Sequence, residues 1–205
     1  MSVNHVKNKP YIYGLTGGIA TGKSTAINFF LKEGVKVFDS DLAVKKIWSE
    51  NKQLVKHMDS KYCIDMNTKT GKSKLAKLLF DNKDIRNELN SLIHPLVFRM
   101  IDEWIIDNNN EKFLIIDMPL LFEVNYHNYI NKSILIYLDK DKQIERLMNR
   151  DNLTKEESIK RINAQMDLEV KKNMADYIIN NNKSHQDLEI ELERLLKVMN
   201  NENKQ

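Results

Sequence analysis

The chain has 205 residues, of which 41% are hydrophobic and 30% charged, so its size and composition fit one soluble α/β domain with an added region. Its net charge of +3 does not indicate a dedicated nucleic-acid surface, and no apolar run approaches the roughly 18 residues of a membrane span. The polar residues 1–10 lack an apolar segment of signal-peptide length, and the single Cys63 excludes an internal disulfide. We therefore expect a cytoplasmic protein with no membrane, nucleic-acid or obligate protein partner.

A phosphate-binding loop is the most informative feature of the sequence. Residues 17–24 fit the pattern of Gly, four residues and then Gly-Lys-Ser/Thr, between a strand predicted at 11–15 and a helix predicted at 24–32. In this order, backbone N–H groups can surround a phosphate at the positive end of the helix. We assign these residues to ATP binding: Gly17, Gly18, Ile19, Ala20, Thr21, Gly22, Lys23, Ser24 and Thr25.

Two carboxylates follow the second predicted strand. Gly34 predicts the end of the first helix, and residues 35–38 predict a strand that leads into Asp39-Ser40-Asp41. Because parallel strands deliver their carboxyl ends to one edge of a sheet, we expect both carboxylates at the edge that carries the phosphate loop. Asp39 or Ser40 can cap the next helix, so the pattern favours Asp41 for chemistry without excluding Asp39.

Residues 42–110 have an almost wholly helical pattern. The block is too long for an ordinary crossover and predicts an inserted subdomain that shapes a second pocket, with an exposed turn at 65–71. Pro95 is expected to kink or restart the last helix, which places His94 at a bend. For His94, a packing role and a contact with substrate are equally open.

The rest of the chain returns to alternating strands and helices. Residues 113–117 are the most strand-like run and end in Asp117, which could hold a magnesium-bound water. Further strands are predicted at 133–139 and 176–180, and an amphipathic helix at 186–199. We interpret the asparagine runs, such as Asn180-Asn181-Asn182, as composition bias without function.

Arginines mark the helices between the last two strands. Arg146 and Arg150 are four residues apart and therefore share a helix face. Thr154 and Glu157 predict a capping box at the start of the next helix, which carries Arg161. These arginines suit a lid that neutralises a transferring phosphoryl group and excludes water, although a solvated charged surface is an alternative.

Several segments, taken in chain order, form a combination typical of one enzyme family. They are residues 14–25, Asp39-Ser40-Asp41, Ile93-His94-Pro95, Pro119-Leu120-Leu121-Phe122-Glu123, Gln143 with Arg146-Leu147 and Arg150, Arg161-Ile162 with Gln165, and residues 176–180. Together they resemble the dephospho-CoA kinase family over nearly the full chain. The phosphate loop alone is unspecific, and its combination with the other segments carries the resemblance.

The resemblance implies both a reaction and a fold. The reaction is the ATP-dependent, magnesium-dependent phosphorylation of the ribose 3′-hydroxyl of dephospho-CoA, the last step of coenzyme A synthesis. The fold is an α/β P-loop fold of three layers with a five-stranded parallel sheet, an inserted helical acceptor-binding domain and a helical lid. We place the core in residues 1–41, 111–139 and 176–205, the insertion in 42–110 and the lid in 140–175.

The resemblance also implies roles for single residues. Asp41 is the expected base, Lys23 and Arg150 are the other catalytic residues, and Arg146 joins the ATP site. Ser24 is the expected magnesium ligand, with Asp117 acting through water. The expected acceptor-binding residues are Asp39, Asp41, His94, Leu121, Glu123 and Arg161.

One segment departs from the family pattern. Lys74 and Lys77 lie where family members commonly carry arginine, and lysine keeps the charge but loses the bidentate fork. A contact that needs the fork is therefore in question.

Two other classes of function compete with this interpretation. A kinase of the same architecture could act on another nucleoside, a nucleotide or a small alcohol. A nucleotide switch is disfavoured, because Asp117-Met118-Pro119-Leu120 does not supply D-x-x-G and Asn131-Lys132-Ser133-Ile134 lacks the acid of N-K-x-D.

Overall fold

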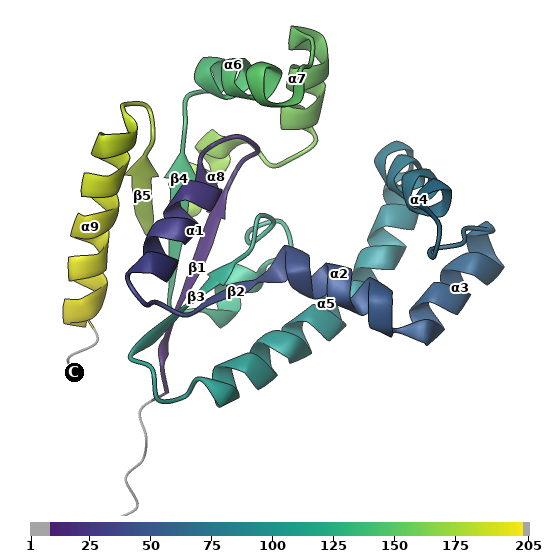
Figure 1. Ribbon diagram of the computed structural model, residues 1–205, viewed down its shortest axis with the longest axis horizontal. Helices are drawn as coiled ribbons and strands as arrows, with labels where there is room; N and C mark the ends of the chain where they lie inside the picture. Colours follow the sequence, from purple (N-terminus) through teal and green to yellow (C-terminus); the bar gives the residue numbers. More distant parts are fainter. Residues whose placement is uncertain (1–8, 203–205) are drawn as a thin grey trace, which may run out of the picture. The chain divides into compact units, whose positions relative to one another are not determined.

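The computed structural model describes residues 9–202, apart from the side chain of Phe80. Our expectations for residues 1–8 and 203–205 lie outside the described residues. The chain divides into two compact units (Figure 1): a sheet unit, formed by the residues up to Phe38 and from Asp107 onward, and a helical unit, Asp39–Ile106. The two boundaries lie a few residues before those at which the sequence placed the insertion.

The sheet unit is built on five strands. They are β1 (Tyr11–Gly17), β2 (Val37–Asp39), β3 (Phe113–Asp117), β4 (Lys132–Tyr137) and β5 (Tyr177–Asn180), in the spatial order β2-β3-β1-β4-β5. Strand β1 runs parallel to β3 and β4, and β4 runs parallel to β5. Leu15 is paired with Asp117 across β1 and β3, so the loop after β1 and the end of β3 meet at one sheet edge.

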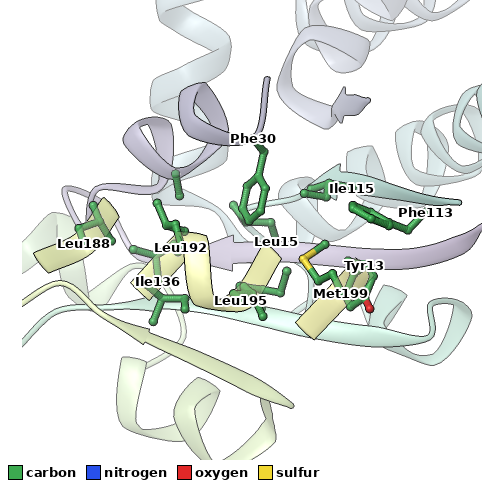
Figure 2. Packing of buried hydrophobic residues seen from close by; sticks show 13 residues of the cluster. Tyr13, Leu15, Phe30, Phe113, Ile115, Ile136, Leu188, Leu192, Leu195 and Met199 are labelled. Carbon is green, nitrogen blue, oxygen red and sulfur yellow. The ribbon is translucent and has the colours of Figure 1, made fainter. Parts of the chain in front are cut away.

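Helices α1 (Lys23–Lys32) and α9 (His185–Glu202) cover one face of this sheet. Tyr13 and Leu15 lie two residues apart on β1, so both side chains point to that face. Figure 2 shows them among the apolar side chains of α9. The other buried members of this cluster are Ala26, Phe30, Phe113, Ile115, Ile134, Ile136, Ile179, Leu188, Leu192, Leu195 and Met199. Burying each large apolar side chain contributes about 1.5–3 kcal/mol to the stability of the fold. This cluster therefore stabilises the edge of the sheet at which β1 and β3 end.

The opposite face is covered by the chain after β3 and by α8 (Leu168–Met174), where Leu168 packs on Leu135 and Tyr137. A Cβ on Gly14 would lie 2.9 Å from two methyl carbons of Leu121, so this turn lies directly on β1. Along the chain between β3 and α8, besides strand β4, lie η1 (Tyr126–Tyr129), α6 (Lys140–Asp151) and α7 (Lys155–Asn163). The capping box predicted at the start of α7 is confirmed.

The helical unit contains α2 (Ser40–Glu50), α3 (Lys52–Tyr62), α4 (Lys69–Asp81) and α5 (Lys83–Asp107), as the pattern of residues 42–110 predicted. Its buried apolar residues are Ala43, Ile47, Leu54, Met58, Ile64, Met66, Leu75, Leu89, Ile93, Val97 and Ile101. Of the kink or restart expected at Pro95, the restart does not occur, because α5 continues through that residue, and the kink stays a prediction. A proline removes one intrahelical hydrogen bond, and the apolar residues on both sides of it still favour one helix.

The exposed turn expected at 65–71 is shorter than predicted and partly buried, since α4 begins at Lys69 and Met66 is 6% exposed. It ends at Thr68, whose hydroxyl oxygen accepts the Gly71 N–H at 3.0 Å and thereby caps α4. A Cβ on Gly71 would lie only 1.8 Å from the backbone oxygen of Asp65. Gly71 therefore lies in the first turn of the helix and permits the close approach of two backbone segments.

Most strand boundaries agree with the sequence to within two residues, and the differences have local causes. The fourth strand was expected to reach residue 139 but ends at Tyr137, and Asp139 is the N-cap residue of α6. Helix α8 and the short η1 were not predicted. Among residues 9–202, no helix is both long and apolar enough to cross a membrane.

Candidate active site

The phosphate loop connects β1 to α1 in a conformation that few side chains favour. Ala20 and Gly22 have φ values of 61° and 95°, both in the left-handed region. The hydroxyl of Thr21 donates to the Gly18 carbonyl oxygen at 2.9 Å, which closes the turn. No acidic side chain lies in the first turn of α1, so no carboxylate there competes with an anion for the positive helix end.

Lys23 and Asp117 form an ion pair beside this loop. The Nζ atom of Lys23 lies 2.5 Å from Oδ1 of Asp117, and their side chains are 18% and 6% exposed. Lys23 comes from the start of α1 and Asp117 from the end of β3, which neighbours β1 in the sheet. The fold thus brings together the cation expected to bind phosphates and the carboxylate expected to bind a magnesium-bound water.

Three amide side chains bind the outward-facing backbone of the loop. Gln143 of α6 donates to the carbonyl oxygen of Ile19 at 2.7 Å, and Gln165 accepts the N–H of the same residue at 2.8 Å. Asn181, which follows β5, donates to the carbonyl oxygen of Thr21 at 2.7 Å.

The sequence interpretation missed these three roles. Gln143 and Gln165 entered only as part of a resemblance, and composition bias was the wrong interpretation for Asn181, which is 5% exposed. The available signal was position, since Asn181 directly follows a parallel strand, as Asp117 ends one.

A second polar cluster lies under the turn after β3. The Pro119 carbonyl oxygen accepts the hydroxyl of Thr16 at 3.0 Å and the ammonium of Lys171 at 2.9 Å. Lys171 is fully buried, and its Nζ lies 2.8 Å from Oε1 of Glu123, which also accepts the Met166 N–H at 3.3 Å. A buried ammonium requires such a partner. Nothing in the sequence distinguished Lys171 from the many exposed lysines.

The candidate lid arginines bind two different partners. Arg146 is half-buried and donates to the carbonyl oxygen of Asn181 at 3.1 Å. Arg150 and Arg161 both bind Asp151, with nitrogen–oxygen distances of 2.8 and 3.1 Å, which ties α6 to α7. The hydrogen bond from Arg150 is the main cause of a lowered pKa for Asp151, and the charges of Arg150 and Arg161 lower it further.

In the helical unit, the two aspartates have different surroundings. Asp39 is the N-cap of α2, and its Oδ1 accepts the Leu42 N–H at 2.9 Å. Asp41 is exposed in the first turn of the same helix. His94 is half-buried on α5 and stacks on Phe98 with ring centroids 6.0 Å apart, and burial lowers the pKa of its imidazole.

Comparison with known proteins decides the family. The family model for dephospho-CoA kinase matches residues 11–187. The chain belongs to the dephospho-CoA kinase family. A dephospho-CoA kinase of Oceanobacillus iheyensis is 35% identical, with 92% of this chain and 98% of that protein covered. One from Lactobacillus johnsonii is 39% identical, with coverages of 91% and 96%.

Solved structures agree with this family and with the expected α/β fold. Dephospho-CoA kinase from Campylobacter jejuni is 31% identical, with a TM-score of 0.71 and coverage of 94% of this chain and 98% of that one. A structure from Thermus thermophilus is 26% identical, with a TM-score of 0.81 and coverages of 93% and 98%. The resemblance stated from the sequence is thereby confirmed.

Two of the acceptor residues assigned from the family pattern are engaged elsewhere. Leu121 is fully buried against β1, and one carboxylate oxygen of Glu123 binds Lys171. Their assignment to acceptor binding therefore rests on the resemblance. Lys74 and Lys77 are both exposed on α4.

Proposed function

We propose that the protein transfers the γ-phosphoryl group of ATP to the ribose 3′-hydroxyl of dephospho-CoA, which yields coenzyme A. Membership of the dephospho-CoA kinase family over residues 11–187 supports this reaction. At the level of residues, the observation that carries it is the Lys23–Asp117 pair beside the phosphate loop. Phosphoryl transfer to another nucleoside, a nucleotide or a small alcohol is the alternative.

The phosphate loop and Lys23 bind and orient the nucleotide in this proposal. Phosphoryl transfer requires little covalent chemistry from a protein and depends on positioning and charge neutralisation. The Ser24 hydroxyl, exposed at the start of α1, and the Asp117 carboxylate are the hard oxygen ligands that Mg²⁺ prefers, so these residues fit the ion directly or through water. When bound, Mg²⁺ neutralises charge on the β- and γ-phosphates.

Asp41 is the proposed general base for the acceptor. A sugar hydroxyl is a poor nucleophile near neutral pH, so a carboxylate that takes its proton lowers the barrier. The proton moves to Asp41 while the bond from the 3′-oxygen to the γ-phosphorus forms and the bond to the β-γ bridging oxygen breaks. Asp39 is less suited, because its Oδ1 is bound in the helix cap.

The lid arginines are proposed to neutralise the phosphoryl group during transfer and to exclude water. Arg150 and Arg161 share Asp151 in this structure. Each would therefore exchange a carboxylate for a phosphate oxygen on acting, which makes the lid responsive to a bound nucleotide. Arg146 bonds a backbone oxygen instead and requires no such exchange of an ion pair.

An acceptor panel tests the proposal directly. The purified chain is given ATP and Mg²⁺ with dephospho-CoA, adenosine, AMP or shikimate, and ADP release is measured together with the mass of each product. We expect ADP release and an added phosphate with dephospho-CoA alone, and Lys23→Ala serves as the inactive control.

Each other outcome of the panel has its own meaning. Turnover with a different acceptor would overturn the acceptor assignment, and acceptor-independent ADP release would favour a nucleotide switch. Activity of the purified chain by itself would also show that no protein partner is required. The cytoplasmic location stays a prediction.

A further inference from the structure

We propose that Gln143, Gln165 and Asn181 form an amide clamp that positions the phosphate loop, so that the Ala20 and Gly22 N–H groups point to the nucleotide phosphates. These residues are positioning residues, since they hold the loop from outside and bind the phosphates only through it. The inference rests on the proposed role of the loop as the ATP site and deepens it.

The first step concerns the peptide between Ile19 and Ala20. No cis peptide bond occurs among the described residues, and in a trans peptide the C=O and N–H groups point in opposite directions. Gln143 holds the Ile19 carbonyl oxygen at 2.7 Å. The N–H of Ala20 is therefore directed away from α6 and into the loop.

The same argument holds at the next two bonds of the clamp. Gln165 binds the Ile19 N–H at 2.8 Å, so the Gly18 carbonyl of that peptide points the other way, where the Thr21 hydroxyl binds it. Asn181 holds the Thr21 carbonyl oxygen at 2.7 Å, which directs the Gly22 N–H into the loop. Three side chains thus fix three backbone groups of the loop, namely the N–H and the carbonyl of Ile19 and the carbonyl of Thr21.

The second step concerns the backbone conformation that the clamp supports. Left-handed residues within such a turn aim successive N–H groups into one anion-binding concavity. Ala20 carries a Cβ and still has φ 61°, a value that is uncommon for non-glycine residues and that contacts with the surroundings can stabilise. Gln143 and Gln165 bind both sides of the residue that precedes it and supply that support.

Two of the clamp side chains pack directly against loop glycines. A Cβ on Gly18 would lie 2.7 Å from Nε2 of Gln143, and a Cβ on Gly22 would lie 2.2 Å from Nδ2 of Asn181. Gln143 and Asn181 are only 2% and 5% exposed. Buried amides need hydrogen-bond partners, so the loop backbone and these side chains satisfy each other.

The clamp also joins three separate segments to one loop. Gln143 lies in the first turns of α6, Gln165 lies between α7 and α8, and Asn181 follows β5. Gln143 and Gln165 therefore anchor the two ends of the α6–α7 segment to Ile19. The lid helices thus contact the backbone directly before Ala20, whose N–H is proposed to bind the nucleotide phosphates. We expect a change at either glutamine to alter nucleotide binding more than acceptor binding.

The direction of each hydrogen bond gives a test with matched charge. Gln143→Glu, Gln165→Glu and Asn181→Asp each add one negative charge near the loop and leave side-chain size almost unchanged. The backbone carbonyls bound at 143 and 181 need a donor, which a carboxylate does not offer, whereas the Ile19 N–H bound at 165 needs an acceptor, which it does. The affinity for MgADP, measured by calorimetry without acceptor, should fall at least about tenfold further at 143 and 181 than at 165.

Two controls separate positioning from folding, and a second pair of variants serves if the acidic ones do not fold. The dissociation constant of dephospho-CoA should stay within about twofold of the wild-type value in each variant, because a merely structural loss would weaken both ligands and lower the melting temperature. Gln53→Met, at an exposed glutamine of α3, should leave the affinities for MgADP and for dephospho-CoA unchanged. If the acidic variants fail to fold, Gln143→Met and Gln165→Met replace them. Both are expected to bind MgADP more weakly than the wild type. An unchanged MgADP affinity overturns the clamp.

The outcomes distinguish this inference from the proposed function. If the wild-type protein binds no MgADP, the ATP site itself is wrong. If the wild type binds MgADP and the acidic change at 165 costs as much as the changes at 143 and 181, the hydrogen-bond directions do not matter and the clamp is overturned. A larger loss at 143 and 181 than at 165 supports it.

Discussion

The phosphate loop and the two aspartates proposed for the acceptor, Asp39 and Asp41, are held in opposite ways. The loop is bound by side chains that lie 124, 146 and 160 residues away in the sequence. In the helical unit, Asp39 bonds a backbone N–H three residues ahead, and Asp41 is exposed. The phosphate loop, which we propose as the nucleotide half of the site, is therefore fixed by the tertiary fold, whereas the two aspartates proposed for the acceptor half depend on local helix geometry.

This difference has a consequence for catalysis. Donors that are held in place by folding stabilise charge without reorganising during the reaction, which is a large source of rate enhancement. We expect an exposed carboxylate such as Asp41 to gain its orientation only when substrate binds. Substitutions in the nucleotide half should thus affect nucleotide binding and rate together, and substitutions of the exposed aspartate should affect mainly the rate.

The largest effect is expected for Asp41→Asn. Removing a general base lowers kcat by about 10²–10⁴-fold, and the isosteric amide keeps the shape of the helix start. Asp39→Asn is the matched comparison, because asparagine also caps helices well, so this variant should keep wild-type stability and lose less turnover than Asp41→Asn. Steady-state kinetics with dephospho-CoA measures both variants. Near-normal turnover in folded Asp41→Asn, or an equal loss in Asp39→Asn, would contradict the assignment.

Lys23→Ala tests the nucleotide half. Loss of the ammonium removes a preorganised cation from the phosphates and leaves the nearly buried Asp117 without this partner, so we expect turnover to fall about a hundredfold or more. Lys32→Ala, at the exposed end of α1, controls for net charge and should be close to wild type. A variant that loses no more than a few-fold in kcat/KM for ATP would remove Lys23 from the mechanism.

Arg150→Ala tests the lid, with an expected loss of about a hundredfold in kcat. Arg150 is exposed and pairs with Asp151, so its removal should cost little stability. Arg99→Ala removes another exposed arginine, on α5, and should have no effect on turnover. Unchanged rates in Arg150→Ala would transfer the lid role to Arg146 or Arg161.

The sequence predicted local features of the molecule better than it predicted tertiary contacts. The strands, the phosphate loop and the capping box of α7 were predictable, because periodicity and capping patterns are local. The family was also recognisable from motifs along the chain. At Pro95 the local rule left a kink and a restart open, and the continuous helix α5 excludes only the restart.

The contacts around the site were beyond the sequence because they are tertiary. Lys171 resembles any other lysine in a basic helix, and only the fold shows it fully buried against Glu123 and Pro119. Asn181 was concealed within a run of asparagines. The resemblance named Gln143 and Gln165, but the fact that both bind Ile19 became visible only with coordinates.

Gly71→Ala tests whether local geometry also holds the helical unit together. The added Cβ would collide with the Asp65 backbone oxygen, which has no flexible side chain to move, so we expect a loss of about 1–3 kcal/mol in unfolding free energy. Both tryptophans of the chain, Trp48 and Trp104, lie in the helical unit, so urea unfolding followed by their fluorescence reports on it. Lys72→Ala, exposed in the same helix turn, is the control.

An unaltered fluorescence midpoint in Gly71→Ala would mean that the turn before α4 shifts at little cost. A midpoint that falls equally by fluorescence and by far-ultraviolet circular dichroism would instead mean that the two units unfold together. The expected result is a larger shift in the fluorescence transition than in the dichroism transition, because the collision lies within the helical unit.

The smallest expected effect concerns pH and His94. Burial lowers the pKa of His94 in the folded chain below its ordinary 6.5. Between about pH 6.5 and that lowered value, the unfolded chain binds a proton that the folded chain does not, so stability falls as the pH falls through this range. Above pH 6.5 both states are neutral at His94 and this contribution vanishes. His94→Phe removes the titration and leaves an aromatic ring beside Phe98.

Urea unfolding of the wild type and His94→Phe at pH 7.5 and 5.0 measures this effect. The difference at pH 7.5 reports packing alone, and the change in that difference between the two pH values reports the proton. We expect the wild type to lose more stability than the variant on acidification, by less than about 1 kcal/mol because the ring is only half-buried. Equal losses would show that protonated His94 gains a compensating partner in the folded protein, which would favour an anion-binding role for it over packing.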